Sequence, residues 1–213
     1  MKMFNPEIEN QLTEVLQAMV NDVTIALFTK SGECPTCEET KSYMKEIEAL
    51  SDKIHLQELD INSERAKEYQ VEMVPSIVLL NHKNEYLGIK FNGIPAGHEI
   101  NSFIPAILEV SGKVSEVSEK LQRRVDKITQ PVNIKVFITL TCPHCPGAVQ
   151  KAHKLALMNP NINSEMIEAQ TFYDLSNKFN VSSVPKIVIN DKYELIGNQP
   201  IEVILKEIEK IPQ

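Results

Sequence analysis

The chain contains the stretch Cys142-Pro143-His144-Cys145 and the earlier stretch Cys34-Pro35-Thr36-Cys37, and these two stretches decide its fold. Each is a CxxC motif that follows a predicted strand, at 134–138 and 23–28, and precedes a helical pattern. A cysteine in that place lies beside unpaired backbone N–H groups and the positive end of the helix dipole, which stabilise a thiolate. The second cysteine lies one turn along, close enough to attack the first. The motifs predict redox centres, with Cys142 and Cys34 as nucleophiles and Cys145 and Cys37 as resolving thiols.

Three residues inside the motifs are expected to tune the centres. Pro35 and Pro143 suit the first helical turn, where no backbone N–H is needed. His144 stands between the cysteines of the second motif, and its protonated form would stabilise the neighbouring thiolate and make that pair more oxidising.

Each motif belongs to one half of an internal repeat. Each half reads as a helix followed by β-α-β-α-β-β-α, and the βαβ start implies a parallel strand pair with a right-handed crossover. The repeated segments are the first helices at 6–20 and 114–129, the second strands at 54–60 and 164–169, the third strands at 74–79 and 184–189, and the closing helices at 97–110 and 200–210. The sequence therefore predicts an α/β fold with two units, 1–112 and 113–213, each a mixed sheet flanked by helices.

Composition narrows the class of protein. The 213 residues have a net charge of -7 and 42% hydrophobic residues, which is ordinary for a globular protein and argues against a nucleic-acid or membrane-surface partner. The charge is uneven, since 1–112 hold 18 acidic and 9 basic side chains, whereas 113–213 hold 11 and 13. The first twenty residues lack an apolar run of signal-peptide type, and no stretch of about 18 apolar residues is present. We expect a cytoplasmic protein, in which a CxxC is catalytic or metal-binding.

Zinc is the alternative reading of four cysteines in two pairs. Zinc ribbons, however, space their pairs by about 15–20 residues. Here Cys37 and Cys142 are 105 positions apart, each inside its own βαβ pattern, so the redox interpretation is favoured and no metal or organic cofactor is expected.

These patterns resemble the thioredoxin fold, written twice. They are more closely similar to the archaeal and thermophilic protein disulfide oxidoreductases, also called glutaredoxin-like proteins, which carry two thioredoxin units in one chain. The segments that carry the resemblance are Cys142–Val149 with Ala152-His153-Lys154 after it, Val184-Pro185-Lys186-Ile187-Val188-Ile189, and Gly93-Ile94-Pro95-Ala96-Gly97-His98-Glu99. The likeness spans essentially the whole chain.

The resemblance implies specific roles. Pro75 and Pro185 would follow cis peptide bonds and, with Val74 and Val184, face the CxxC motifs and hold substrate backbone. It also implies dithiol–disulfide exchange on protein substrates, and re-reduction by a thioredoxin-reductase-like flavoprotein.

The chain departs from ordinary thioredoxins at the position of their buried acid, where it has Phe28 and Val136. Proton transfer must then use solvent or the aligned carboxylates Glu58 and Glu168, although two solvated strand carboxylates are an equally good reading. Lys186, just past the second Val-Pro, is either an electrostatic aid to that centre or a solvated charge.

The second centre is expected to dominate. Cys34 follows Glu33, an adjacent anion that disfavours the thiolate, whereas Cys142 follows Thr141 in the less acidic half. The histidines His98 and His153 are expected to be structural, with His153 on a surface or half-buried helix position.

The sequence thus predicts a protein disulfide reductase, oxidase or isomerase. Two alternatives remain open. One is a redox-switched binding module, in which the disulfides control a partner surface. The other is the electron-transfer arm of a peroxide-reducing system, although that arm normally retains one CxxC and this chain has two.

Overall fold

The computed structural model describes residues 2–212, and its fold divides into two compact units. Unit 1 comprises Met1–Tyr86, Phe91–Ile94 and Ile104–Val114, and unit 2 comprises Leu87–Lys90, Pro95–Phe103 and Ser115–Gln213. The division therefore differs from a single cut after residue 112, because two internal segments group with the later unit.

Two glycines explain why these segments belong to unit 2. A Cβ on Gly88 would lie 2.9 Å from the carbonyl oxygen of Ile162, and one on Gly97 would lie 2.5 Å from that of Leu140. Both glycines also have a positive φ. Only a residue without a side chain allows such close backbone approach.

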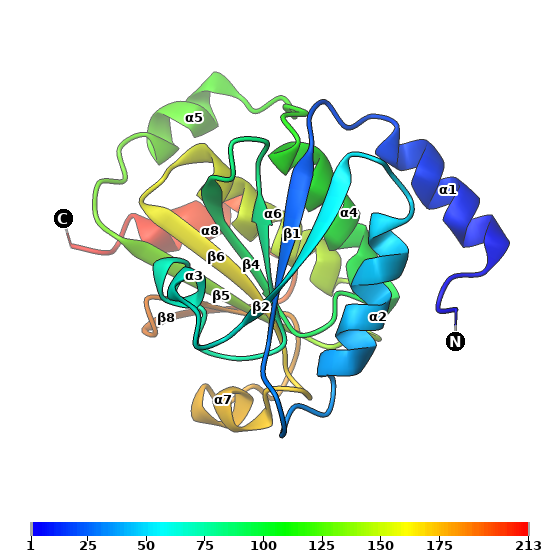
Figure 1. The fold of residues 1–213 in the computed structure, drawn as a ribbon. Helices are drawn as coiled ribbons and strands as arrows, with labels where there is room; N and C mark the ends of the chain where they lie inside the picture. Colours follow the sequence, from blue (N-terminus) through cyan, green and yellow to red (C-terminus); the bar gives the residue numbers. More distant parts are fainter. Residues whose placement is uncertain (1, 213) are drawn as a thin grey trace. The chain divides into compact units, whose positions relative to one another are not determined.

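The first half of the chain follows the predicted order. Its elements are α1 Pro6–Leu16, β1 Val23–Thr29, α2 Cys37–Glu48, β2 Ile54–Asp60, α3 Glu64–Glu68, β3 Ser76–Leu80, β4 Tyr86–Asn92, the 3-10 turn η1 Gly97–Glu99 and α4 Ile100–Val110 (Figure 1). Strand β1 is parallel to β2 and antiparallel to β3, and β4 lies next to β3.

The second half repeats this order. Its elements are α5 Glu119–Val125, β5 Val132–Ile138, α6 Cys145–Met158, β6 Ile162–Glu168, α7 Tyr173–Lys178, β7 Lys186–Ile189, β8 Tyr193–Ile196 and α8 Ile201–Ile208. Strand β5 is parallel to β6 and antiparallel to β7, which is antiparallel to β8. The mixed, helix-flanked thioredoxin-like topology predicted from the repeat is confirmed.

The first helices of the two halves are shorter than their periodicity predicts. Helix α1 starts after Asn5, whose side chain accepts a hydrogen bond from the Ile8 N–H, and it ends at Leu16. Helix α5 covers only Glu119–Val125 of the predicted 114–129. The apolar pattern continues further because Met19 and Ile128 are buried from the turns that follow each helix.

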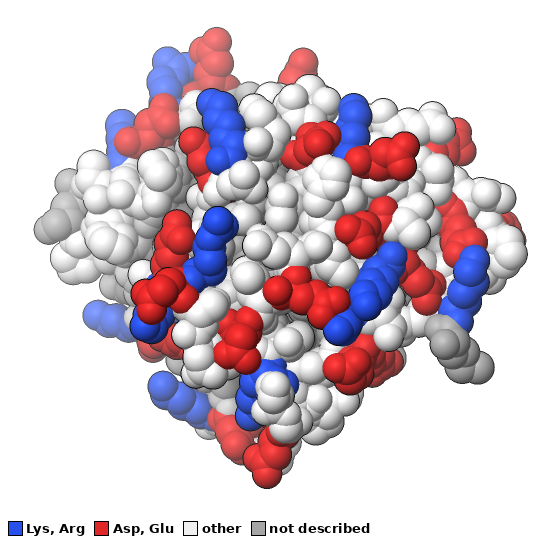
Figure 2. Space-filling model, in the orientation of Figure 1, with Lys and Arg blue, Asp and Glu red and all other residues white. Residues whose placement is uncertain are grey.

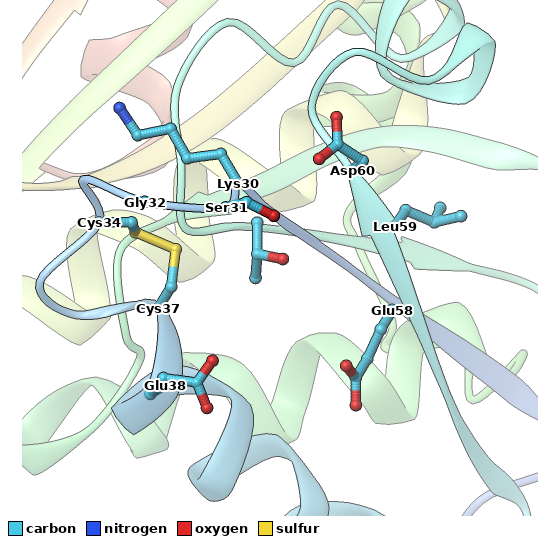
Figure 3. Close-up of a pocket in the computed structure, with 10 residues that line it drawn as sticks. Lys30, Ser31, Gly32, Cys34, Cys37, Glu38, Glu58, Leu59 and Asp60 are labelled. Carbon is cyan, nitrogen blue, oxygen red and sulfur yellow. A yellow bond between two sulfur atoms is a disulfide. The ribbon is translucent and has the colours of Figure 1, made fainter.

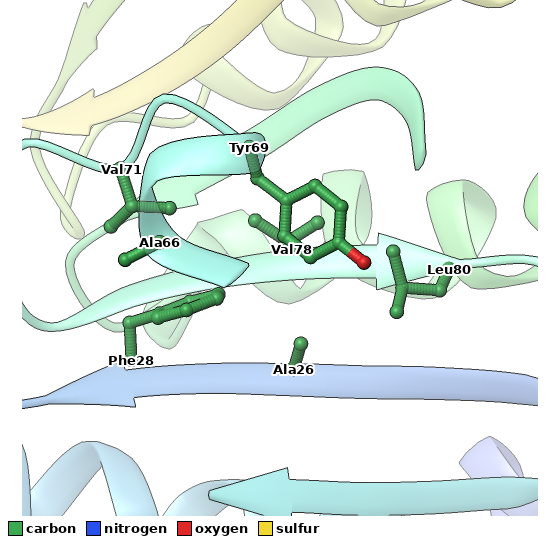
Figure 4. Close-up of a cluster of buried hydrophobic side chains, with 7 residues drawn as sticks. All are labelled: Ala26, Phe28, Ala66, Tyr69, Val71, Val78 and Leu80. Carbon is green, nitrogen blue, oxygen red and sulfur yellow. The ribbon is translucent and has the colours of Figure 1, made fainter. Parts of the chain in front are cut away.

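The core of each unit forms on both faces of its sheet, because successive strand side chains point to opposite faces. In unit 1, Phe28 packs edge-on against Tyr69 with ring centroids 6.3 Å apart. Figure 4 shows this cluster, which contains Ala26, Phe28, Ala66, Tyr69, Val71, Val78 and Leu80. The corresponding cluster of unit 2 contains Phe137, Ile167, Phe179 and Val188. Phe28 and Val136 are fully buried, so apolar side chains occupy the positions of the expected acid.

Charged side chains of both signs lie on the visible face of the molecule (Figure 2). Figure 2 shows acidic and basic side chains interspersed over the visible face. Within residues 2–212, no helix has the length and apolar character needed to cross a membrane.

Candidate redox site

The cysteines form two disulfides, Cys34–Cys37 and Cys142–Cys145, with Cα–Cα distances of 5.4 and 5.5 Å. Cys37 and Cys145 are the first residues of α2 and α6. The residues before them, Thr36 and His144, make no side-chain cap hydrogen bond. No side-chain cap therefore occupies the backbone N–H groups at these helix starts, although the Cys37 N–H donates to the Cys34 carbonyl at 3.2 Å. N–H groups at a helix start can stabilise a thiolate.

The first cysteine of each motif is more exposed than the second. Cys34 is half-buried and Cys142 is 8% exposed, whereas Cys37 is 4% exposed and Cys145 is fully buried. A partner can reach the first cysteine of each motif more easily than the second. This order agrees with the predicted roles of nucleophile and resolving thiol, which stay predictions.

The Val74–Pro75 and Val184–Pro185 peptide bonds are cis. The carbonyl of Pro75 accepts a 2.8 Å hydrogen bond from the N–H of Gly93, and the carbonyl of Pro185 accepts an equal one from Gly197. The two prolines thus occupy corresponding places in the two units.

In unit 2, the structure brings the motif and the Val-Pro segment together. The Sγ atom of Cys142 lies 3.9 Å from the carbonyl oxygen of Val184. Val184 is half-buried and Pro185 is buried, so the valine presents the reachable part of this segment. Val74 and Pro75 show the same burial in unit 1.

The helix starts differ in charge. Helix α2 carries Glu38 and Glu39 in its first turn, and Glu33 lies just before Cys34. The first turn of α6 has no acidic residue. Carboxylates near a thiolate oppose its formation, so this difference favours the thiolate at Cys142 over that at Cys34.

Glu58 is poorly suited to accept protons. Its carboxylate forms ion pairs with Lys41 at 2.6 Å and Lys45 at 3.5 Å. The hydrogen bond from Lys41 holds the pKa of Glu58 below its ordinary value. The group therefore stays ionised near neutral pH and does not provide the missing acid.

Glu168 has a structural contact that the sequence did not predict. Its buried carboxylate accepts hydrogen bonds from the backbone N–H groups of Gln170 at 3.2 Å and Thr171 at 2.6 Å. The side chain therefore closes the turn after β6. The reading of Glu168 as a solvated strand carboxylate is wrong.

Lys186 is directed at partners outside the CxxC motif. Its Nζ donates to the carbonyl of Phe179 at 2.6 Å and pairs with Glu194 at 2.9 Å. The residue is 4% exposed, so it is not a solvated charge. Its expected role as an electrostatic aid to Cys142 gains no support from these contacts.

Glu99 is a buried carboxylic acid that sequence reasoning did not select. It is fully buried on η1, and η1 packs against α6, the helix that Cys145 begins. Nearby, the N–H of His98 donates to the carbonyl of Leu140, two residues before Cys142, at 2.9 Å. Ser102 donates to one carboxylate oxygen, and the other has no hydrogen-bond partner among the described residues. Burial raises the pKa of Glu99 to about 7.

The signal for Glu99 was available in the sequence, because it ends the segment 93–99 that carried the family resemblance. It could not be distinguished there from a surface residue, because its burial depends on η1 packing against α6.

The histidines have different environments. His153 is 2% exposed on α6, which corrects the expectation of a surface or half-buried position. Its Nδ1 lies 2.8 Å from the Ser164 Oγ, and burial lowers its pKa to about 3, so the ring is neutral at pH 7. His144 and His98 are exposed.

A four-cysteine metal site would need all four sulfurs in one place. The disulfides instead pair the cysteines within each motif. Among the residues that the structure describes, no three His, Cys, Asp or Glu side chains are grouped so as to hold a metal ion.

The chain is similar to known proteins in sequence and in structure. A thioredoxin-domain family model matches residues 132–210. Among curated proteins, the F subunit of alkyl hydroperoxide reductase from Staphylococcus aureus is 30% identical over 97% of this chain, and NADH dehydrogenase of Bacillus subtilis is 29% identical over 94%. The chain spans only 38% and 37% of the lengths of these two relatives.

Two solved structures match over nearly their whole length. The F subunit of alkyl hydroperoxide reductase from Enterococcus faecalis (C503A mutant) has a TM-score of 0.91 and 30% identity, covering 97% of this chain and 100% of that one. A protein disulfide oxidoreductase from Aeropyrum pernix has a TM-score of 0.87 and 30% identity, covering 96% and 92%. The chain therefore belongs to the thioredoxin-fold thiol–disulfide oxidoreductases, and it carries two CxxC redox centres.

Proposed function

We propose that the protein catalyses dithiol–disulfide exchange on protein substrates through both centres, with the Cys142–Cys145 centre dominant. The observation that carries the proposal is the 3.9 Å separation between the Cys142 Sγ and the Val184 carbonyl oxygen. The outer sulfur thus lies beside a half-buried backbone segment along which an extended substrate segment can bind. The similarity to the Aeropyrum pernix protein supports this reading.

The reaction starts from the dithiol form of the second centre. The Cys142 thiolate attacks one sulfur of a substrate disulfide, which forms a mixed disulfide and releases the other substrate sulfur as a thiolate that takes up a proton. Cys145 then attacks the Cys142 sulfur, which releases the second substrate thiol and leaves the Cys142–Cys145 disulfide. Two electrons pass from the dithiol to the substrate, and the reverse steps oxidise a substrate dithiol.

The scheme needs no metal or organic cofactor, because the cysteine pairs hold the electrons. We propose a thioredoxin-reductase-like flavoprotein as the donor that returns each disulfide to the dithiol, and the cytoplasm as the compartment. The Cys34–Cys37 pair forms a second centre, so one chain can hold a mixed disulfide while another forms, as isomerisation requires.

Glu99 is the proposed proton acceptor for the second centre. It is buried on the element that packs against α6, and its pKa of about 7 lets it take and return a proton near neutral pH. It would replace the acid that Phe28 and Val136 exclude from the sheet.

Turnover tests the proposal. The protein should accelerate the reduction of insulin disulfides by dithiothreitol well above the uncatalysed rate, and a variant with all four cysteines changed to serine should not. A wild-type rate equal to that of the cysteine-free variant would exclude catalysis and favour the redox-switched binding module.

A second candidate function is electron transfer to a peroxide-reducing partner. The observation that favours it is the 30% identity to the F subunit of alkyl hydroperoxide reductase over 97% of this chain. The prereduced, desalted chain should then re-reduce an oxidised thiol peroxidase much faster than it reduces insulin. Faster reduction of insulin would exclude this candidate as the main function.

A further inference from the structure

A cavity of about 350 Å³ opens beside the Cys34–Cys37 disulfide. Figure 3 shows the disulfide on one side, Glu38 next to it at the start of α2, and Glu58 and Asp60 on β2 across the space. Gly32 lines the same space, and a Cβ built on it would meet no atom within 4 Å, so this wall is open. The size suits a small molecule or one long side chain.

The cavity is negatively charged. Three carboxylates line it, those of Glu38, Glu58 and Asp60, against the single ammonium of Lys30. Glu58 is neutralised by its ion pair with Lys41. Asp60 accepts hydrogen bonds from the backbone and side chain of Asn62 through one oxygen only. Within the described residues, neither Glu38 nor Asp60 takes part in an ion pair.

We propose that the first centre acts on disulfides that carry an ammonium group near the sulfur, held between Glu38 and Asp60. This inference rests on the proposed exchange chemistry and adds the substrate class of this centre. Because the Cys34–Cys37 pair lines the cavity, its reaction partner must contain a thiol or disulfide. The carboxylates favour partners that carry a positive charge next to the sulfur. A small aminothiol disulfide and a peptide disulfide flanked by lysine share this chemistry.

Exchange at the first centre proceeds in two displacements. In the reduced centre, the Cys34 thiolate attacks one sulfur of the disulfide R–S–S–R, forming a Cys34–S–S–R bond and expelling one thiolate. Cys37 attacks the Cys34 sulfur and expels the second thiolate. The dithiol is oxidised to the Cys34–Cys37 disulfide, its two protons end on two R–SH molecules, and dithiothreitol regenerates the centre.

The test isolates each centre. The Cys142→Ser/Cys145→Ser variant retains only the first centre, and the Cys34→Ser/Cys37→Ser variant, retaining only the second, is the matched control. Each is reduced and mixed with cystamine, which is cationic, bis(2-hydroxyethyl) disulfide, which is neutral, or dithiodiglycolate, which is anionic. For each centre we take the rate with cystamine divided by the rate with the neutral disulfide. Dividing this ratio at the first centre by the same ratio at the second centre cancels the intrinsic reactivity of the two probes.

This normalised ratio should be about fivefold or more at low salt, and should fall toward one in about 0.5 M salt. Glu38→Gln and Asp60→Asn should lower the ratio, and Lys30→Gln should raise it. A ratio of one at low salt, or equal ratios in all these variants, would overturn the inference.

Peptide disulfides flanked by lysine or by glutamate identify the source of the ligand. Faster reaction of the lysine peptide at the first centre assigns the site to protein substrates, and a preference confined to cystamine assigns it to small aminothiols. Absence of reaction with every probe at both centres would instead contradict the proposed exchange function.

Discussion

The two CxxC centres have the same backbone plan but different surroundings. Both follow a parallel strand, begin an uncapped helix and have a cis Val-Pro in the corresponding place. Around Cys34 stand Glu33, Glu38 and Glu39, whereas the first turn of α6 carries no acid. The shared fold supplies the same geometry at both centres, and we propose that the neighbouring charges determine which centre reacts faster.

Two effects oppose one another in this comparison. Burial disfavours a thiolate, and Cys142 is the more buried of the outer sulfurs. Two unit charges about 4 Å apart in water interact by about 1 kcal/mol, and three carboxylates lie close to Cys34 in the sequence, those of Glu33, Glu38 and Glu39. Because Cys142 meets no acid in the first turn of α6, we expect the charges to outweigh the burial.

Removal of each nucleophile should give the largest effect. Cys142→Ser should lower insulin reduction by about tenfold or more, because a hydroxyl is a far weaker nucleophile than a thiolate. Cys34→Ser should lower it by less than about threefold, because the first centre contributes the minor share. Equal losses in the two variants, measured at pH 7 with dithiothreitol, would show that the second centre is not dominant.

Glu99→Gln should change the pH dependence of the exchange rate at the second centre and not at the first. Glutamine cannot take a proton, so exchange at Cys142–Cys145 should fall by roughly tenfold near pH 7. This is less than the roughly 100-fold or more usual for acid–base catalysis, because solvent can carry part of the proton transfer. The rate at Cys34–Cys37 should not change. Rates for the two single-centre variants across pH 5–9 measure this, and an unchanged profile at the second centre would remove Glu99 from the proposed proton path.

The same substitution has a stability signature. The pKa of Glu99 is about 7 in the folded protein, against an ordinary value of 4.5, so its favourable contribution is complete below pH 4.5 and is lost as the pH rises through 7. The pKa difference of about 2.5 units, at about 1.36 kcal/mol per unit, corresponds to a loss of roughly 3 kcal/mol. Urea unfolding at pH 4.5 and 8 should show a smaller pH dependence in Glu99→Gln than in the wild type.

Removal of the α2 carboxylates should make the reactivity of the Cys34 thiol more similar to that of the Cys142 thiol. Glu38→Gln/Glu39→Gln should lower the pKa of the Cys34 thiol and raise its alkylation rate at pH 7 by about threefold, the effect of roughly half a pKa unit. Glu64→Gln/Glu68→Gln on α3 is the control, because it removes the same number of charges and neither residue lines the cavity beside Cys34. An equal increase in the control would show that net charge alone is responsible.

Lys186→Met should change exchange least. The ammonium group is bound by Phe179 and Glu194, so the rate at Cys142 should change by less than about twofold, while stability falls by about 1–3 kcal/mol through the lost hydrogen bonds. A large rise in the pH midpoint of Cys142 alkylation would restore Lys186 as an electrostatic aid.

The sequence predicted what depends on local pattern. The order of helices and strands along the chain, the repeat, and the place of each CxxC between a strand and a helix follow from periodicity and turn residues over short stretches. The sequence does not predict burial that depends on segments far apart in the chain. For this reason the burial of His153 and Glu168 differs from expectation, and Glu99 is not identified from the sequence. The end of α1 at Leu16 is also not predicted by the sequence, because Met19 lies beyond the helix but is buried and continues its apolar periodicity.

The central claim is that the Cys142 thiolate forms more readily than the Cys34 thiolate. Iodoacetamide alkylation of the reduced protein between pH 4 and 10, followed by mass spectrometry of the two cysteine peptides, measures both titrations in one sample. We expect a lower pH midpoint and faster modification at Cys142 near pH 7. Faster modification of Cys34 at that pH would contradict it.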